Sequence, residues 1–292
     1  MKIARIVLLL ALAFGISIPV CAQNSTAAAP AAVQVRDLKL NSKLMAREMP
    51  YKVILPQDYE RATGERFGVV YLLHGLTGHF DNWADKTKLK EYAAGFRYIL
   101  VTPEGNDGWY SDSAAVPNDR YESYIVQELI PEIDKNYRTT ADRDHRAIAG
   151  LSMGGYGAIK FGLKYPAMFA AAGSFSGALG ATSFNEKNAG GIGKSIDAIF
   201  GADDSETRKA NDIFKMVREI TPEKLKALPF IYLDCGTEDF LYQSNREFSD
   251  LLQKQKIPHE YRELPGAHNW IFWNTQVKEF LEVVQTKIPS FK

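Results

Sequence analysis

Residues Arg146–Lys164 read RAIAGLSMGGYGAIKFGLK, and this stretch decides the fold. Arg146–Ala149 is typical of a short buried strand, and Gly154–Lys164 has the pattern of a helix. The pentapeptide Gly150-Leu151-Ser152-Met153-Gly154 joins the two, and its glycines permit a tight turn against neighbouring backbone. The pattern therefore predicts that the Ser152 hydroxyl is exposed above the sheet, beside the positive N-terminus of a helix.

Strands and helices alternate on both sides of this turn. Further strands are predicted at Phe67–Leu73, Tyr98–Thr102, Phe169–Phe175, Phe230–Asp234 and Glu260–Leu264. Further helices are predicted at Tyr121–Tyr137, with a kink at Pro131, and at Leu241–Lys256 and Trp270–Lys287. Because such alternation builds right-handed crossovers, we expect an α/β fold with a mostly parallel sheet of about eight strands and helices on both faces. The first two strands, Val33–Leu40 and Met49–Leu55, have no helix between them, so the sheet should begin antiparallel.

The first residues have the pattern of an export signal. Lys2 and Arg5 precede the apolar run Ile6–Ile18, and Val20-Cys21-Ala22 resembles a cleavage site with small residues. A membrane anchor is the alternative, but the run is shorter than the ~20 apolar residues that span a bilayer. A lipoprotein signal at Cys21 is a second alternative, although the residues before it match poorly. We therefore predict a signal peptide at residues 1–22 and an exported protein, periplasmic or secreted.

The rest of the chain predicts one domain. Residues 23–32 are low in complexity and are expected to form a flexible leader. Residues 33–292 are long enough for a single large α/β domain. Within it, residues 178–222 break the alternation of strands and helices, and we expect them to form a small cap-like insertion over the site.

Composition excludes several classes of partner and cofactor. The 292 residues hold 35 basic and 35 acidic side chains, so the net charge gives no footprint for nucleic acid or an anionic membrane. After signal cleavage Cys235 has no cysteine to pair with, and it is expected to be a core residue. The sequence contains no His/Cys cluster with zinc spacing and no phosphate-binding glycine loop. We therefore expect no metal or cofactor, and a small molecule as the partner.

A neutral serine needs a base before it can attack a carbonyl carbon. His268 lies in the turn Pro265–Trp270, between the last predicted strand and the last helix, and so at the same rim as Ser152. His74, which ends a buried strand, is the alternative. It precedes the serine, whereas sites of this kind have the order serine, acid, histidine. We therefore predict His268 as the base.

The acid is expected between the serine and the histidine. Residues 234–240 read DCGTEDF and lead from a strand into a loop that offers three carboxylates. Asp239 lies in the loop, from which it can reach the imidazole, and is preferred over Glu238 and then Asp234. It would fix the histidine tautomer and stabilise the imidazolium. Asp234, at the strand end, would otherwise accept hydrogen bonds from turn amides.

Two backbone amides are candidates for binding a developing oxyanion. One is the N–H of Met153, directly after the serine. The other belongs to the loop that reads HGLTG at residues 74–78, where we choose the Leu76 N–H, with Thr77 second. An ordinary glycine turn is the alternative interpretation of this loop.

Aromatic residues in neighbouring loops are candidates for a substrate pocket. Trp83, Trp109 and Tyr110 lie at the predicted rim and would form a wall for an acyl or aryl group. Alternatively, these side chains pack the loops. Trp270 and Trp273 are expected to pack the last helix against the sheet.

The ordered motifs resemble the esterase D family. They are Leu73-His74-Gly75, Pro103-Glu104-Gly105, Gly108-Trp109-Tyr110-Ser111-Asp112, Gly150-Leu151-Ser152-Met153-Gly154-Gly155 and Gly266-Ala267-His268-Asn269-Trp270. That group includes tributyrin-type and feruloyl esterases, S-formylglutathione hydrolases and mycolyltransferases. The resemblance covers roughly residues 35–288. It implies the α/β-hydrolase fold, no cofactor, the triad Ser152, Asp239 and His268, and oxyanion donors at Leu76 and Met153.

The resemblance also sets the expected function. S-formylglutathione hydrolases are cytosolic, whereas this chain has a predicted export signal, so the likeness points to the tributyrin-type and feruloyl-type esterases. We expect an exported carboxylesterase that hydrolyses short-chain, aryl, feruloyl or sugar esters through an acyl-enzyme on Ser152. An acyltransferase with the same triad and a thioesterase are the alternatives. A non-catalytic binding protein is disfavoured because the serine, histidine and aspartate are all present.

Overall fold

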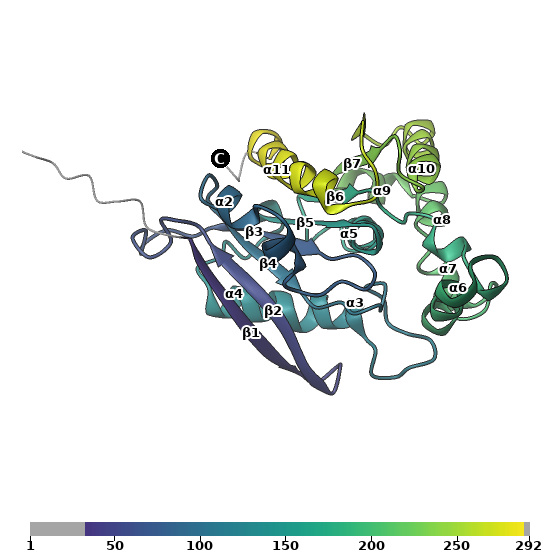
Figure 1. The fold of residues 1–292 in the computed structure, drawn as a ribbon, viewed down its shortest axis with the longest axis horizontal. Helices are drawn as coiled ribbons and strands as arrows, with labels where there is room; N and C mark the ends of the chain where they lie inside the picture. The colour runs from purple at the N-terminus through teal and green to yellow at the C-terminus, as the bar shows by residue number, and fades with distance from the viewer. Residues whose placement is uncertain (1–32, 289–292) are drawn as a thin grey trace, which may run out of the picture. The chain divides into compact units, whose positions relative to one another are not determined.

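The computed structural model describes residues 33–288. Residues 1–32 and 289–292 lie outside the described residues, and with them the predicted signal peptide and leader. The described residues contain an eight-stranded sheet in the order β1-β2-β4-β3-β5-β6-β7-β8 (Figure 1). Its strands are β1 (Gln34–Ser42), β2 (Arg47–Leu55), β3 (Gly68–Leu73), β4 (Tyr98–Pro103), β5 (Arg146–Leu151), β6 (Ala171–Phe175), β7 (Phe230–Gly236) and β8 (His259–Leu264).

The pairing of the strands follows the prediction. β1 pairs with β2, and β2 with β4, in antiparallel fashion, whereas the pairs from β4 through β3, β5, β6 and β7 to β8 are all parallel. Strands β3 to β6 are buried along their whole length, as expected for a sheet covered on both faces. The predicted α/β-hydrolase architecture, with an antiparallel start and a parallel centre, is confirmed.

Helices cover both faces of the sheet (Figure 1). The α-helices are α1 (Asn82–Lys86), α2 (Leu89–Ala93), α3 (Tyr121–Tyr124), α4 (Ile130–Asn136), α5 (Met153–Lys164), α6 (Glu186–Phe200), α7 (Glu206–Lys209), α8 (Ile213–Arg218), α9 (Pro222–Ala227), α10 (Tyr242–Lys254) and α11 (Trp270–Lys287). One core cluster joins α3, α4, α5, α8 and α10 to one face of the sheet. A second cluster joins α1, α2 and α11 to the other face. None of the described helices is long and apolar enough to cross a bilayer.

The helix predicted at Tyr121–Tyr137 is not continuous. It consists of α3, a π-helical turn at Ile125–Leu129 and α4. Pro131 has no N–H to donate to the preceding turn, so the hydrogen-bond ladder is interrupted there. The kink predicted at this proline therefore takes the form of a wider turn just before it.

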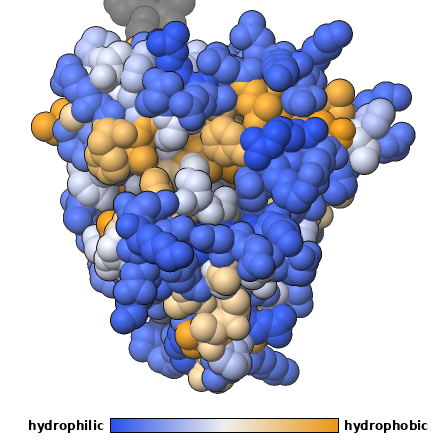
Figure 2. Space-filling view, turned by 90° about the vertical axis from the view of Figure 1, so that its right-hand side faces the viewer, coloured by the Kyte–Doolittle hydropathy of each residue, from blue (hydrophilic) through white to orange (hydrophobic). Residues whose placement is uncertain are grey.

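The predicted insertion at 178–222 contains a short 3-10 turn, α6, α7 and α8. Of these helices, α8 packs against α5 and α10, whereas α6 and α7 lie farther out (Figure 1). Arg208 is buried and donates hydrogen bonds to carbonyl groups of Thr182, Phe184 and Gly201, which tie the segment together. Tyr156 of α5 donates to the Asn211 carbonyl at 2.7 Å. Figure 2 faces the side that carries α6 and α7, where apolar surface gathers in a band bordered by hydrophilic residues.

Candidate active site

The Ser152 turn is held in a backbone conformation that few non-glycine residues adopt. Its φ is +52° and its ψ is −117°. The Ser152 N–H donates to the Phe175 carbonyl at 3.0 Å, and its carbonyl accepts from the Ala178 N–H at 2.9 Å. These bonds fix the strained residue from the neighbouring strand β6 and the loop after it. The side chain stands between the end of β5 and the first turn of α5.

The glycine after the serine is required by a close approach of two backbones. A Cβ atom on Gly154 would overlap the carbonyl oxygens of Leu73 and His74. Because that overlap involves backbone atoms, a side-chain rotation cannot relieve it. The turn therefore packs directly against the end of β3, which brings Ser152 next to the loop at residues 74–78.

The structure brings the three predicted polar side chains together in single file. His268 Nε2 lies 3.0 Å from Ser152 Oγ, and His268 Nδ1 lies 2.8 Å from Asp239 Oδ2. The other oxygen, Asp239 Oδ1, accepts a hydrogen bond from the Leu241 N–H at 2.8 Å. Each residue comes from a different connection, after β5, β7 and β8 respectively. The carboxyl ends of parallel strands thus place the three groups at one rim.

Burial and hydrogen bonding act in opposite directions on Asp239. Its side chain is fully buried, which on its own favours the neutral acid. The hydrogen bonds with His268 and with the Leu241 N–H outweigh this, and they hold the pKa of Asp239 below its usual value. At neutral pH the group is therefore a carboxylate, which accepts the Nδ1 proton of the imidazole and leaves Nε2 free to face the serine.

Two aromatic rings fix the orientation of the imidazole. The Phe240 ring centroid lies 4.6 Å from that of His268, and the Trp273 ring meets it edge-on at 4.8 Å. Trp273 is buried, whereas Phe240 is 78% exposed. The histidine ring is therefore held between a core side chain and a surface side chain.

The other candidates for the acid lie elsewhere. Glu238 is exposed. Asp234 is fully buried, and burial raises the pKa of its carboxyl well above the usual value. The hydrogen bonds from turn amides predicted for Asp234 are wrong, since no described amide donates to its carboxylate. Successive residues of β7 point to opposite faces, and this places Asp234 under α11.

Both ring nitrogens of His74, the alternative base, contact backbone groups. Its Nε2 accepts from the Gly105 N–H at 2.9 Å, and its Nδ1 lies 2.8 Å from the Gly75 carbonyl oxygen. Glu104 lies 3.2 Å from Nε2. Burial opposes ionisation of Glu104, but the adjacent His74 ring and hydrogen bonds from the backbone amides of Asn106 and Phe80 lower its pKa to about 2. His74 therefore joins the loops behind the site and does not contact Ser152.

The predicted oxyanion donors belong to residues near Ser152, since Met153 follows it directly in the chain and Leu76 lines the cavity that opens onto it. The Leu76 and Met153 N–H groups have no acceptor among the described residues, and Met153 begins α5, where the first amides are free of intrahelical bonds. The Thr77 N–H, the second choice, instead donates to Asp107 Oδ1 at 2.6 Å, and Thr77 has a φ of +59°. Asp107 thus holds the loop and leaves the Leu76 amide available.

A cavity of about 440 Å³ opens onto Ser152 and His268, and we call it the serine cleft. It is also lined by Gly75, Leu76, Thr77, Gly78, Asn82, Lys86, Leu151, Phe240, Asn269, Trp270 and Trp273. None of these residues belongs to the insertion at 178–222, so a covering role for that segment stays a prediction. Among the described residues no group of three or more His, Cys, Asp or Glu side chains is placed to hold a metal ion.

The predicted aromatic wall is wrong in its residues. Trp83, Trp109 and Tyr110 are at most 3% exposed, and none of them lines the serine cleft. Trp83 donates its indole N–H to the Leu73 carbonyl at 3.0 Å, and Tyr110 donates its hydroxyl to the His74 carbonyl at 3.0 Å. These side chains pack the loops from behind, which is the alternative that the sequence left open.

Other aromatic residues form the wall instead. Phe240, Trp270 and Trp273 line the cleft, and Trp270 meets both Trp273 and the buried Trp83 edge-on. Trp270 and Trp273 also pack the start of α11, as the sequence predicts. The sequence could have indicated Phe240 as a wall residue, because it directly follows the candidate acid and a side chain at that point of the loop must lie near the histidine.

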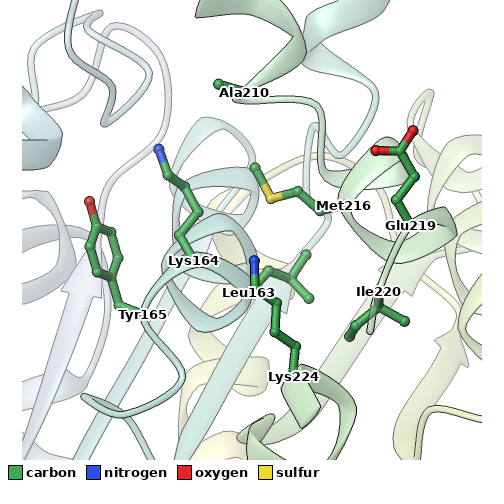
Figure 3. A pocket seen from close by; sticks show the side chains of 8 residues that line it. All are labelled: Leu163, Lys164, Tyr165, Ala210, Met216, Glu219, Ile220 and Lys224. Carbon is green, nitrogen blue, oxygen red and sulfur yellow. The ribbon is translucent and has the colours of Figure 1, made fainter. Parts of the chain in front are cut away.

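A second hollow lies at the other end of α5 and is shown in Figure 3. Its volume is about 350 Å³, and we call it the α5–α8 groove. It is lined by Leu163, Lys164, Tyr165, Ala210, Met216, Glu219, Ile220 and Lys224. The polar ends of the labelled side chains are spread around the groove rather than directed at one another (Figure 3).

Known proteins that are similar to this chain include esterases. The model of the family described as "Putative esterase" matches residues 42–282. An acetyl esterase of Caldicellulosiruptor saccharolyticus is 28% identical over 85% of this chain and 97% of its own length. An esterase of Mycobacterium tuberculosis is 32% identical over 74% of this chain, which spans about half of that longer protein. A solved ferulic acid esterase superposes with a TM-score of 0.75 at 30% identity, covering 87% of this chain and 98% of its own.

Proposed function

This chain belongs to the esterase family and is a carboxylesterase-type hydrolase, and we propose that it acts as an exported serine esterase with Ser152 as nucleophile. One observation carries the serine mechanism. Ser152, His268 and Asp239 are hydrogen-bonded in single file, at 3.0 Å and 2.8 Å, beside two free backbone amides. That arrangement supports acyl transfer through a covalent intermediate.

The first half-reaction forms the acyl-enzyme. Ser152 Oγ attacks the ester carbonyl carbon while His268 Nε2 takes the hydroxyl proton, and the carbonyl electrons move onto oxygen. The Leu76 and Met153 N–H groups donate to that oxyanion, and the N-terminus of α5 favours its negative charge. The tetrahedral intermediate then expels the alcohol, which takes its proton from Nε2.

The second half-reaction returns the free enzyme. His268 Nε2 takes a proton from water, whose oxygen attacks the acyl carbon, and the same amides hold the second oxyanion. Collapse releases the carboxylic acid and returns the proton to Ser152 Oγ. Throughout, the Asp239 carboxylate keeps the Nδ1 proton in place and stabilises the imidazolium. The Leu241 N–H in turn fixes the orientation of this carboxylate.

The lining of the cleft supports a small acyl or aryl group as the substrate. Phe240, Trp270 and Trp273 offer apolar faces around the histidine, and Leu76 and Leu151 line the same cavity. Relatives are named acetyl esterase and ferulic acid esterase, which fits acyl groups of this size. We therefore infer esters of short aliphatic or aromatic acids as substrates.

Export rests on the sequence of the first 22 residues. Expression of the full chain in a Gram-negative host should yield a periplasmic protein whose N-terminal residue is Gln23. N-terminal sequencing of the periplasmic fraction checks this, and an uncleaved protein in the cytosol would contradict it.

Ser152→Ala is the decisive test of the nucleophile. Without the hydroxyl no acyl-enzyme forms, and kcat/KM on p-nitrophenyl butyrate should fall by about four orders of magnitude or more. Labelling by a fluorophosphonate should disappear with it. Ser183→Ala, an exposed serine in the insertion, is the matched control and should keep both. Circular dichroism should show the same fold for all three proteins, and full turnover by Ser152→Ala would sink the proposal.

A further inference from the structure

Of the described residues that line the serine cleft, one is a lysine and none is an arginine, aspartate or glutamate. That lysine is Lys86. The carboxylate of Asp239 is buried behind the imidazole and does not line the cavity. We propose that Lys86 makes the cleft select esters that carry a negative charge. This inference rests on the proposed function and names the substrate class of the same site.

The position of Lys86 places its ammonium group at the mouth of the cleft. It is the last residue of α1, which follows the loop that holds the Leu76 amide. Lys86 Nζ lies 5.3 Å from the centroid of the Trp270 ring. Trp270 meets Trp273 edge-on at 5.3 Å, and Trp273 contacts the His268 ring. The ammonium group is thus two aromatic rings away from the imidazole that faces the serine.

The ammonium group has no carboxylate partner in the described part of the chain. No described Asp or Glu oxygen lies within 4.0 Å of Lys86 Nζ. Its neighbour Asp85 pairs with Lys90 instead, at 3.6 Å. The ammonium group of Lys86 lies over the ring of Trp270, a favourable but weak contact for a cation. A lysine held in this way, exposed and unneutralised, is available to an anion that enters the cleft.

This arrangement predicts which chemical group the preferred esters have in common, namely a carboxylate. An ester with its carbonyl at Ser152 and its apolar part along the aromatic wall would direct a carboxylate on its far side toward the ammonium group, since Ser152, Trp270 and Lys86 line one cavity. The carboxylate can belong to the acyl part, as in a half-ester of a dicarboxylic acid, or to the alcohol part, as in an ester of a hydroxybenzoic acid. Either source gains an ion pair that a neutral ester lacks.

The test compares matched anionic and neutral esters. Mono-p-nitrophenyl glutarate against p-nitrophenyl butyrate places the charge on the acyl part, and 3-acetoxybenzoate against phenyl acetate places it on the alcohol part. Lys86→Met keeps an unbranched side chain and removes the charge. In at least one pair the ratio of kcat/KM for the anionic over the neutral ester should fall by about fivefold, as expected for a solvent-exposed ion pair.

Controls separate this contact from the general field of the protein. Lys86→Arg should retain the ratio, and Lys88→Met, a nearby exposed lysine outside the cavity, should also retain it. For the wild type, salt near 1 M should reduce the ratio, because it screens exposed charges. An unchanged ratio for Lys86→Met in both pairs, or an equal fall for Lys88→Met, overturns the proposal. A failure of the proposed serine mechanism would give a different result, because Ser152→Ala would then still turn over the ester.

Discussion

Helix α5 has a hollow at each end, and the two hollows differ in what their side chains do. The serine cleft lies at its N-terminus with a volume of about 440 Å³, and the α5–α8 groove lies at its C-terminus with about 350 Å³. Both have mixed polar and apolar walls. In the cleft, however, the lining residues Ser152 and His268 are hydrogen-bonded to each other, whereas no hydrogen bond or ion pair joins the side chains of two described residues that line the groove (Figure 3). Volume alone therefore does not distinguish a site from a surface hollow.

The cleft also carries a backbone cost that the groove lacks. Ser152 has a positive φ, and the Asp239 carboxylate is fully buried with its charge. Strained backbone and buried charge each reduce stability unless the surroundings compensate them. Behind the groove, the buried pair of Glu122 and Lys160 carries a charge cost of the same kind, but no described residue that lines the groove has a positive φ. The strained serine backbone therefore distinguishes the N-terminal end of α5, where we propose the active site.

Removing the carboxylate behind the histidine is the strongest way to sharpen this contrast. Asp239→Asn should lower kcat/KM on p-nitrophenyl butyrate by about 10⁴-fold, because an amide at this position no longer holds the Nδ1 proton in place. Steady-state kinetics at neutral pH measures this effect.

The matched control is a carboxylate in the groove. Glu219→Gln should change kcat/KM by less than about twofold, since exposed surface substitutions have small effects. If Asp239→Asn stays within tenfold of the wild type, or if Glu219→Gln matches it, the two hollows are not distinguished in the way described above.

Much of the cleft was predictable because its polar residues lie where strands end. Ser152, Asp239 and His268 each follow a strand of the parallel sheet, so a correct order of strands places them at one rim. The sequence also predicted the antiparallel start and the Leu76 amide, whose neighbour Thr77 is taken by Asp107. The roles of these groups in catalysis stay predictions until the variants are measured.

The walls of the cleft were not predictable in the same way. Whether Trp83 or Tyr110 faces a cavity or the core depends on how loops fold over one another, which periodicity does not reveal. Both donate hydrogen bonds to carbonyl groups at the end of β3 and are buried. Phe240 gave no hydrophobic pattern of its own, since it is a single apolar residue in a polar loop. The α5–α8 groove was missed for the same reason, as its lining comes from two separate segments of the chain.

An intermediate effect is expected at the aromatic wall. Phe240→Ala removes an exposed ring beside His268, so it should raise KM for p-nitrophenyl butyrate by roughly three- to tenfold, the loss of about 1 kcal/mol of apolar contact. The melting temperature should hardly change, because the ring is 78% exposed. Kinetics and thermal unfolding on the same samples measure both quantities.

Met216→Ala in the groove should give the opposite pattern. The side chain is half-buried against the main core, so the melting temperature should fall by a few degrees while KM stays unchanged. A rise in KM for Met216→Ala would mean that the groove takes part in substrate binding, and the contrast between the hollows would break.

Glu122, which pairs with side chains at the groove end of α5, is expected to affect stability far more than turnover. Its carboxylate pairs with Lys160 at 2.8 Å and with Lys164 at 2.5 Å, and Tyr165 donates to it at 2.6 Å. Burial opposes its ionisation, but the two ammonium groups lower the pKa of Glu122 to about 2. Since the folded pKa lies below the unfolded value of about 4.3, this stabilisation is present above that value and is lost as pH falls toward 2.

Glu122→Gln should therefore be less stable than the wild type at pH 7, by about 3 kcal/mol, because it leaves the buried Lys160 without its charged partner. The difference should shrink between pH 5 and pH 2, where the wild type loses its own carboxylate. Urea unfolding across this range measures it. At neutral pH the folded variant should keep kcat/KM within about twofold.

The unchanged turnover expected for Glu122→Gln is the most demanding test of the difference between the two hollows. Lys160 donates to the Tyr110 carbonyl at 2.7 Å, and Tyr110 donates to the carbonyl of His74, whose next residues carry the Leu76 amide. A chain of contacts thus runs from Glu122 to the oxyanion loop. If Glu122→Gln lowers kcat without changing KM, the charge at the groove end positions the amide at the cleft end, and the two ends of α5 act as one unit.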